Sequence, residues 1–488
     1  MKKTSCYIIF LALLLSSCDK LLEVKPQSQI TDQVFFRNEG DFEPNVVGIY
    51  TVMRSIANNV TYGTERSEEL ISATNSRFTV AWSQTLSPSS GAVNYSEWYR
   101  GIGHCNLLLE KIQGFAFAAN PNLKKKIVGE TLALRAYFYF HLLRVFGSVP
   151  IVLEAITDEN VILHKRASAS EVMAQVLSDL DAATAQFTAM TDFSKTNYPS
   201  KYRFAYGSVM AMKADALLWK ASVAGGGPAD LQAAVAAITE AESTGVSLQP
   251  DFAKVTGVRA AANNEVLMAA YYNKDETPGG NYAKNALPFK DVLEGAINKE
   301  QIPYVKNSTN GQGAYQISPL SKSLFTNPAD KRIPYTWIAD MYASGPKISW
   351  ITKYPGTVYA DDRYADNDLI IYRLADLYLL KAEAYAALED VNNSKKYLDN
   401  VKLRAGVDVY AGDMTKTALE KEILNERGRE LFFENKRWFD LVRFHKAGII
   451  DVYNYVPNLK GKTTPLFWPV NTTVLANNPE MTQTDGYK

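Results

Sequence analysis

The sequence predicts a mostly α-helical protein, in which a tetratricopeptide-like scaffold of helix pairs carries a loop-rich insert of mixed structure. Three observations support this fold class. Apolar residues recur with helical spacing on both sides of the chain's centre, and residues 382–398 match a helix-turn-helix repeat pattern. Between the two helical parts, in residues 251–365, the periodicity fades and Tyr, Asn, Gly and Pro become frequent, which is typical of loops and short strands.

Residues 130–146 give the strongest helical signal, because Ala133, Ala136, Tyr137 and Phe140 fall at positions i, i+3, i+4 and i+7. The segment is apolar on nearly every side, so we expect it to be buried. Further helices are predicted at 171–187, 203–224 and, after a Gly-Gly-Gly-Pro break, 229–243.

Helices resume after the insert and are predicted at 369–388, 393–404 and 417–434. Here Ala382-x-x-Tyr385, followed by Ser394-x-x-x-Leu398, fits the 34-residue tetratricopeptide pattern at the right separation. Ser and Leu replace the usual Ala and Phe of the second helix. With several helix pairs around this match, a repeat scaffold is predicted.

The N-terminus has the order of features found in a bacterial lipoprotein signal. Two lysines precede an apolar stretch that is too short to span a membrane as a helix, and Leu-Ser-Ser-Cys follows, which resembles the lipobox. The prediction is cleavage after residue 17 and lipidation of Cys18; the alternative is an ordinary signal peptide with an incidental Cys. The predicted organisation is a signal segment at 1–17, a lipid-anchored tether at 18–35, an N-terminal helical part at 36–250, the insert at 251–365 and C-terminal helical repeats at 366–488.

Composition excludes several classes of protein. The chain has 488 residues with 52 Lys+Arg and 52 Asp+Glu, so it lacks the basic excess that nucleic-acid binding requires. Its 28 Tyr, 21 Phe and 7 Trp argue against intrinsic disorder. Only the N-terminal apolar run approaches membrane length, which excludes a polytopic membrane protein.

Metal, cofactor and nucleophile chemistry finds little support in the sequence. The four histidines, His104, His141, His164 and His445, show no metal-ligand spacing. We expect His141 to be a core histidine and Cys105 a buried structural thiol, since no motif marks Cys105 as a nucleophile. The acidic stretch 361–368 could hold calcium but lacks the EF-hand spacing, so a solvated loop is favoured. No metal or cofactor is predicted.

Glu426, Glu430 and Glu434 follow one another at i+4 steps, with arginines nearby. Such carboxylates could act as the acid and base of a glycosidase. However, adjacent arginines would keep them ionised, whereas a general acid needs a raised pKa. The favoured interpretation is a salt-bridged structural helix.

Several blocks, in order along the chain, resemble the SusD/RagB family of outer-membrane nutrient-binding lipoproteins. They include Leu-Arg-Ala-Tyr-Phe at 134–138, Arg-Leu-Ala-Asp-Leu-Tyr at 373–378 and Arg-Trp-Phe-Asp-Leu-Val-Arg at 437–443. The start of the mature chain at 18–23, Trp-Tyr-Arg-Gly-Ile at 98–102, Asn-Glu-Arg at 425–427 and the tail at 481–487 are also similar.

The resemblance implies four tetratricopeptide-like helix pairs, a loop-rich ligand-binding part and no catalysis. It implies a lipid anchor in the outer membrane, with the protein exposed at the cell surface. It also implies a partner, a TonB-dependent porin of the SusC type, and a ligand that is usually a glycan and sometimes a peptide.

A sugar site needs exposed aromatic rings for the apolar ring face and polar side chains for the hydroxyls. Two stretches supply both. The candidates in the first stretch are Tyr62, Arg66, Glu69, Asn75, Arg77 and Trp82. In the insert they are Tyr304, Asn310, Tyr315, Trp337, Tyr342 and Trp350. The alternative is that many of these aromatics belong to the core or contact the porin.

The predicted function is binding of an oligosaccharide nutrient and its delivery to the porin. The alternatives are a peptide-binding member of the same family, a surface glycosidase using Glu430 or a neighbour, and a scaffold that binds only protein.

Overall fold

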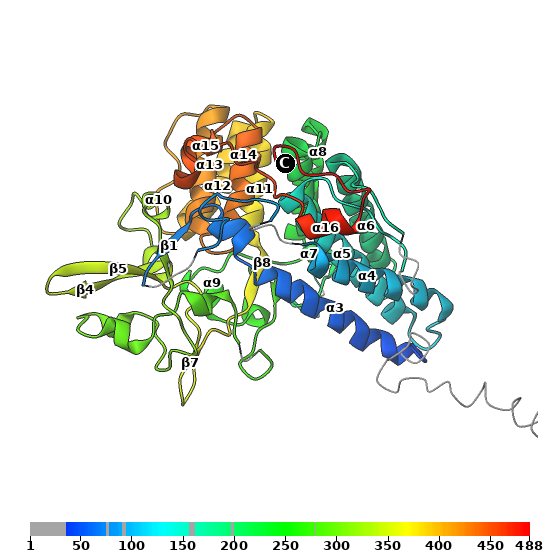
Figure 1. The fold of residues 1–488 in the computed structure, drawn as a ribbon, viewed down its shortest axis with the longest axis horizontal. Coiled ribbons are helices and arrows are strands. Elements are labelled where there is room, and N and C mark those ends of the chain that lie inside the picture. Colours follow the sequence, from blue (N-terminus) through cyan, green and yellow to red (C-terminus); the bar gives the residue numbers. More distant parts are fainter. Residues whose placement is uncertain (1–35, 75–77, 90–93, 156–161, 197–199, 278) are drawn as a thin grey trace, which may run out of the picture.

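The computed structural model describes residues 36–488 except 75–77, 90–93, 156–161, 197–199 and 278 (Figure 1). The predicted signal segment, the lipidation site Cys18 and the tether at 18–35 therefore lie outside the described residues. Among the described residues, the structure has no helix that is long and apolar enough to cross a membrane.

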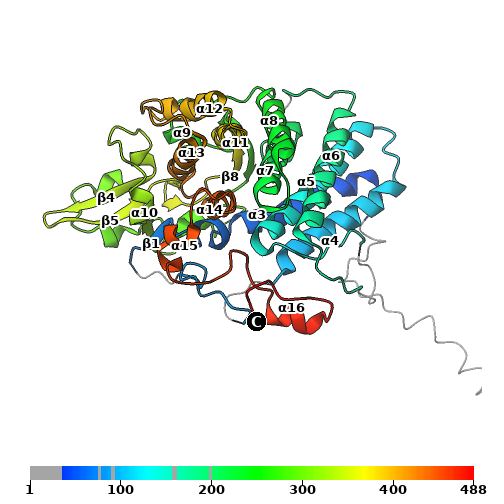
Figure 2. The same cartoon turned by 90° about the horizontal axis from the view of Figure 1, so that it is seen from above.

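The N-terminal part is helical, as predicted, and its long helices pack as antiparallel neighbours. Helix α5 packs against α6, and α7 packs against α8, while α3 crosses α4 and α5 (Figures 1 and 2). The helices are α3 (Phe42–Ala57), α4 (Ser96–Lys111), α5 (Pro121–Phe146), α6 (Ala169–Thr188), α7 (Tyr206–Val223) and α8 (Pro228–Glu242). The predicted burial of 130–146 is confirmed, since nearly every side chain there is in the core.

The C-terminal part is also helical and joins the N-terminal helices where α11 packs on α7 and α8 (Figure 2). Its helices are α11 (Leu374–Ala387), α12 (Val391–Arg404), α13 (Lys416–Glu430) and α14 (Arg437–Lys446). The repeat positions Ala382, Ser394 and Leu398 are fully buried. The small side chains of Ala382 on α11 and Ser394 on α12 let the two helices pack closely, so the tetratricopeptide-like pairing is confirmed.

Two predicted boundaries are wrong. The helix predicted at 417–434 ends at Glu430, and residues 369–373 form strand β8 (Leu369–Arg373) rather than the start of a helix. This strand pairs antiparallel with β2 (Val266–Ala270) at the beginning of the insert. Its sequence, Leu-Ile-Ile-Tyr-Arg, is rich in β-branched and aromatic residues, so strand propensity and pairing override the helical periodicity that continues into α11.

The insert consists of short elements and joins the N-terminal part through a sheet. The four-stranded sheet has the order β1 (Leu70–Ser72), β3 (Tyr315–Ile317), β5 (Gly345–Ile351) and β4 (Trp337–Tyr342), and β4–β5 forms the hairpin at the left of Figure 1. The insert also contains β6 (Thr357–Val358), β7 (Arg363–Tyr364), α9 (Ala253–Gly257), α10 (Pro319–Lys322) and several 3-10 turns. The C-terminal part ends with two short helices, α15 (Val452–Tyr455) and α16 (Thr472–Asn477). Because β1 pairs with β3, the two stretches that supplied candidate ligand residues lie side by side.

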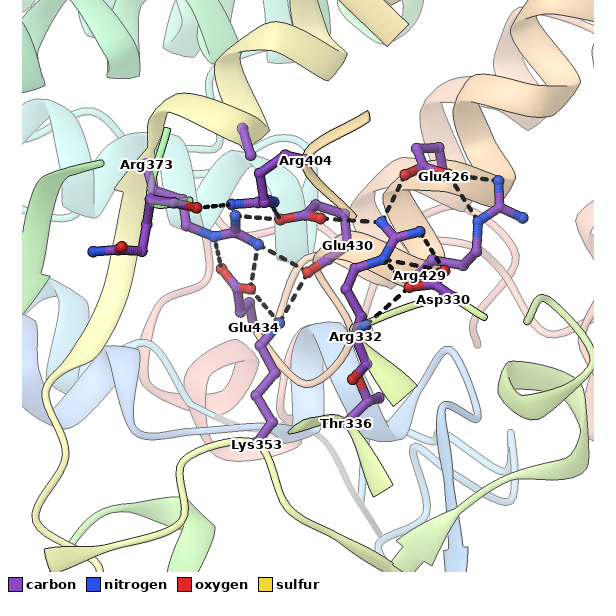
Figure 3. Close-up of polar contacts among 12 residues, drawn as sticks. Asp330, Arg332, Thr336, Lys353, Arg373, Arg404, Glu426, Arg429, Glu430 and Glu434 are labelled. Atoms are coloured by element: carbon purple, nitrogen blue, oxygen red, sulfur yellow. Dashed lines mark hydrogen bonds and ion pairs between the residues drawn. The ribbon is translucent and has the colours of Figure 1, made fainter. Parts of the chain in front are cut away.

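A buried ionic cluster lies where the insert meets the C-terminal helices (Figure 3). The Glu430 carboxylate contacts Arg332 at 3.0 Å, Arg373 at 2.5 Å, and Arg404. The side chains of Arg332, Arg373 and Glu430 have no exposed surface. Burial acts to raise the pKa of Glu430, but the three guanidinium groups outweigh it and hold that pKa well below its usual range.

Glu434 completes the cluster just beyond the end of α13. It accepts hydrogen bonds from the Arg373 guanidinium at 2.7 and 2.9 Å and from the Lys353 ammonium. Glu426 pairs with Arg332 at 2.6 Å. The expectation that these glutamates form salt bridges within the scaffold is confirmed. A carboxylate held ionised in this way is unsuited to donate a proton to a glycosidic oxygen.

Replacing Arg373 by Met should lower the free energy of unfolding by about 3–5 kcal/mol, because Glu430 and Glu434 would lose a buried counter-charge. Urea unfolding of the two proteins measures the difference. The matched control is Arg100→Met, which breaks an exposed pair with Glu97 and should cost about 1 kcal/mol or less. Equal losses in both variants would contradict the structural role of the cluster.

Candidate functional site

Three aromatic rings form a stack at the junction of the N-terminal part and the insert. The ring of Phe78 is stacked with the ring of Trp82, with centroids 4.5 Å apart, and with the ring of Tyr315, with centroids 5.5 Å apart. Trp82 and Tyr315 were predicted site residues that lie more than 200 positions apart in the sequence. Phe78 was missed, because it follows a stretch without periodicity and carries no polar motif.

Hydrogen bonds to strand β1 and to Glu65 fix the orientation of the stack. The Trp82 indole N–H donates to the Leu70 carbonyl at 2.9 Å. The Tyr315 hydroxyl donates to the buried Glu65 carboxylate at 3.0 Å, and the same carboxylate accepts a hydrogen bond from the Thr79 hydroxyl. Because the Trp82 indole N–H and the Tyr315 hydroxyl both have hydrogen-bond partners, the rings are held in place before any ligand binds.

Beside the stack lies an open cleft of about 510 Å³. Tyr315 belongs to both, and although it is only 8% exposed it lines the cleft. One wall of the cleft comes from the end of α3 and the π-helical turn η2 (Thr61–Glu65), and the other comes from the insert. The side chains that line it are mostly polar: Ser55, Asn58, Asn59, Thr61, Glu65, Asn281, Tyr282, Lys284, Asn285, Gln312 and Tyr315.

The insert wall presents polar groups that are available to a ligand. Asn285 and Lys284 are half-buried and Gln312 is exposed, and these three side chains make no hydrogen bond with another residue of the described part of the chain. A carboxamide offers two donors and an acceptor, and an ammonium offers three donors. This set can pair with the hydroxyl, carbonyl or carboxylate groups of a polar ligand while the neighbouring rings cover its apolar faces.

Tyr62 and Arg66 were predicted to contact ligand, but both are buried beneath this surface. The Tyr62 ring packs among aromatic core side chains, including Trp98 and Trp468. The Arg66 guanidinium lies over the Trp438 ring at 4.3 Å and donates to a backbone carbonyl. Burial therefore removes these two residues from the candidate ligand contacts.

Glu69 and Trp350 are also in the interior. The Trp350 indole N–H donates to Asp340 at 3.0 Å, and its ring belongs to a small core cluster of the insert. Glu69 is 3% exposed, and burial raises its pKa to about 8, although Arg437 and Lys353 act to lower it. Neither residue reaches the cleft.

The other candidates are not brought to the stack or the cleft. Tyr304 and Asn310 lie on the loop between Lys299 and β3, where the Tyr304 hydroxyl faces Glu300 and Asn310 donates to Asp362. Trp337 and Tyr342 lie on β4, under the ammonium groups of Lys322 and Lys347 respectively. Asn75 and Arg77 fall outside the described residues.

The acidic stretch 361–368 is not the solvated loop that was expected. Asp366 and Asp368 are buried and accept hydrogen bonds from Arg259, and Asp368 also accepts one from the Tyr202 hydroxyl at 2.8 Å. These carboxylate oxygens serve the packing of the insert. Over the described residues, no three His, Cys, Asp or Glu side chains are grouped so as to hold a metal ion.

Two core expectations are confirmed. His141 is buried and accepts a hydrogen bond from the Trp98 indole N–H at 3.2 Å, and burial lowers the pKa of His141 well below its usual value. Cys105 is fully buried as a free thiol, and burial raises its pKa, which makes it inert.

The fold and the cleft together define a class of protein: a helical-repeat scaffold with a polar cleft next to a stack of aromatic rings. The comparisons identify the family. Residues 267–487 match the model of the SusD family, and residues 20–213 match a model described as starch-binding and associating with the outer membrane. The chain belongs to the SusD/RagB family.

Relatives cover nearly the whole chain. SusD-like protein P38 of Formosa agariphila is 26% identical over 99% of this chain and 98% of its own length. Among solved structures, Bacteroides fragilis NanU is 25% identical, with a TM-score of 0.78 over 95% of this chain and all of that one. A laminarin-binding SusD-like protein has a TM-score of 0.73 at 21% identity, over 93% of this chain and all of that one, and shows the same fold.

Glu69→Gln should stabilise the protein increasingly as pH rises from 5 to 9. The folded pKa of about 8 lies above the ordinary value of 4.5, so the wild-type chain loses stability across this window as ionisation of the buried carboxyl opposes folding. The Gln variant lacks this loss. The measurement is the melting temperature of each protein at both ends of the range, with the exposed Glu480→Gln as control. A difference between wild type and Glu69→Gln that stays constant with pH would contradict the raised pKa.

Proposed function

We propose that the protein binds an oligosaccharide nutrient at the outer membrane and delivers it to a TonB-dependent porin of the SusC type. The observation that carries the binding proposal is the stack of Trp82, Phe78 and Tyr315 beside a cleft in which the carboxamides of Asn285 and Gln312 make no hydrogen bond with the described part of the chain. Sugar rings have an apolar face and a rim of hydroxyls. The aromatic stack can cover the apolar face, and the carboxamides can pair with the hydroxyls.

Family membership supports the same proposal. One matching model is described as starch-binding, and the Starch-binding protein SusD of Bacteroides thetaiotaomicron is 29% identical over 26% of this chain and 22% of that protein. A structural neighbour is described as laminarin-binding. Delivery to a porin rests on the resemblance to SusD-type lipoproteins, whose partner is a SusC-type transporter.

A peptide ligand is the second candidate, since carboxamides and Lys284 can also pair with peptide groups. A glycosidase is disfavoured by the environment of Glu430, and the family consists of binding proteins. Turnover of an oligosaccharide by the purified protein, lost in Glu430→Gln with the fold intact, would establish the enzyme instead.

Trp82→Ala should weaken glycan binding about tenfold, because an aromatic face contributes on the order of 1–1.5 kcal/mol beyond the area that it buries. The test is isothermal calorimetry of the mature chain from residue 18, with Cys18→Ser, against plant, host and microbial oligosaccharides and a peptide digest.

The matched control is Tyr304→Ala, a half-buried ring outside the stack and the cleft, which should leave the affinity unchanged. Circular dichroism checks the fold, since Trp82 also donates to Leu70. Heat from the peptide digest alone would favour the second candidate. No binding heat from any oligosaccharide or from the peptide digest would count against the binding proposal.

Cys18→Ser should abolish incorporation of labelled palmitate and release the protein from the outer membrane. Bacterial lipoproteins carry more than one acyl chain, and two chains anchor a protein stably where one is marginal. Membrane fractionation of the wild-type and Cys18→Ser proteins in the native host measures both effects. A Cys18→Ser protein that keeps its label and its membrane fraction would contradict the lipid anchor.

A further inference from the structure

The two walls of the cleft come from distant parts of the chain, yet both are fastened to one short segment, Phe433–Asn435. This segment follows α13 and precedes α14. Phe433 and Asn435 have φ angles of 61° and 59°, in the left-handed region, so its backbone is a tight and specific turn.

Asn435 holds the first wall. Its side-chain oxygen accepts hydrogen bonds from the backbone N–H groups of Gly63 at 3.0 Å and Thr64 at 3.2 Å, and its side-chain nitrogen donates to the Asn59 carbonyl at 2.8 Å. All three partners lie at or within two residues of the π-helical turn η2. One carboxamide thus contacts three backbone groups beside the π-helical turn, of which the Thr64 N–H also donates to the Val60 carbonyl at 3.0 Å.

Gly63 permits this close contact. A Cβ atom at residue 63 would lie 2.1 Å from the Asn435 carbonyl oxygen, so any larger residue there would push the wall away from the segment. The wall and the segment therefore meet backbone to backbone.

Phe433 holds the second wall. Its carbonyl accepts a hydrogen bond from the Tyr282 hydroxyl at 2.8 Å, and the Tyr282 backbone N–H donates to the Asn58 side chain at 2.6 Å. Tyr282 begins the 3-10 turn η5 (Tyr282–Asn285), which carries Lys284 and Asn285 into the cleft. Glu434, between the two anchoring residues, is itself fixed by Arg373 and Lys353.

We infer that the segment Phe433–Asn435 sets the relative position of the two cleft walls, and that Asn435 is a positioning residue for ligand binding. It does not line the cleft and acts through Asn59, Gly63 and Thr64. The inference rests on the proposed binding function, because it concerns the same cleft.

Three variants of the mature Cys18→Ser chain test the inference. Asn435→Gly keeps the left-handed backbone and removes all three side-chain hydrogen bonds. Asn435→Asp tolerates the same backbone and keeps the acceptor for Gly63 and Thr64, but it replaces the donor to the Asn59 carbonyl by a carboxylate oxygen. Asn120→Gly is the matched control, since it removes an Asn side chain that caps the start of α5 and does not line the cleft.

Calorimetry with the sugar that the wild type binds should show a loss of about tenfold or more for Asn435→Gly. Asn435→Asp should bind more tightly than Asn435→Gly but more weakly than wild type, because it keeps two of the three hydrogen bonds, and Asn120→Gly should match wild type. Recovery by Asp separates positioning from a general loss of stability. Wild-type affinity in Asn435→Gly would overturn the inference while leaving the binding function intact.

Hydrogen exchange tests the same contacts if the wild type binds no sugar, an outcome that counts against the proposed function. The Gly63 amide should exchange faster in Asn435→Gly, and the Thr64 amide should change less because it also donates to the Val60 carbonyl; Asn435→Asp keeps the acceptor and should restore protection at Gly63. Unchanged exchange at these amides in Asn435→Gly would overturn the positioning role independently of any ligand.

Discussion

The constraint on which the rest of the structure depends is the complete pairing of the buried charges around Glu430 and Arg373. A buried ion without its counter-charge costs several kcal/mol, so these side chains accept only a narrow range of positions. They come from the insert, from β8 and from α12 and α13. Pairing them therefore fixes how the loop-rich insert lies on the helical repeats, which short strands and turns alone would define poorly.

The same constraint extends to the binding surface through the residues that follow Glu430. Glu434 is held by Arg373 and Lys353, and its neighbours Phe433 and Asn435 contact the insert and the π-helical turn. A change in the ionic cluster would thus be transmitted through backbone contacts to both walls of the cleft. The glutamates serve as fixed anchors, and their ionised state is unsuited to donating a proton.

The fold could be predicted further from the sequence than the site could. Helical periodicity located most helices to within a few residues, because each one depends on local spacing. Two of the three stacked residues were predicted, and Phe78 was missed. Its contact with Tyr315 depends on the pairing of β1 with β3, which no local pattern encodes. Arg66 was misassigned for a related reason. Arginine is usually exposed, and its burial over Trp438 depends on a helix that comes 370 residues later.

A rigid, half-exposed surface suits capture followed by release. The rings and their hydrogen-bond partners are ordered in advance, so little conformational entropy is lost when a ligand binds. The carboxamides of Asn285 and Gln312 face the open cleft, so each hydrogen bond that they make to a ligand replaces one to water and contributes about 1 kcal/mol. Affinity built from these terms falls in the micromolar to millimolar range, about 4–8 kcal/mol. The proposed delivery to a transporter needs this balance, because tighter binding would slow transfer.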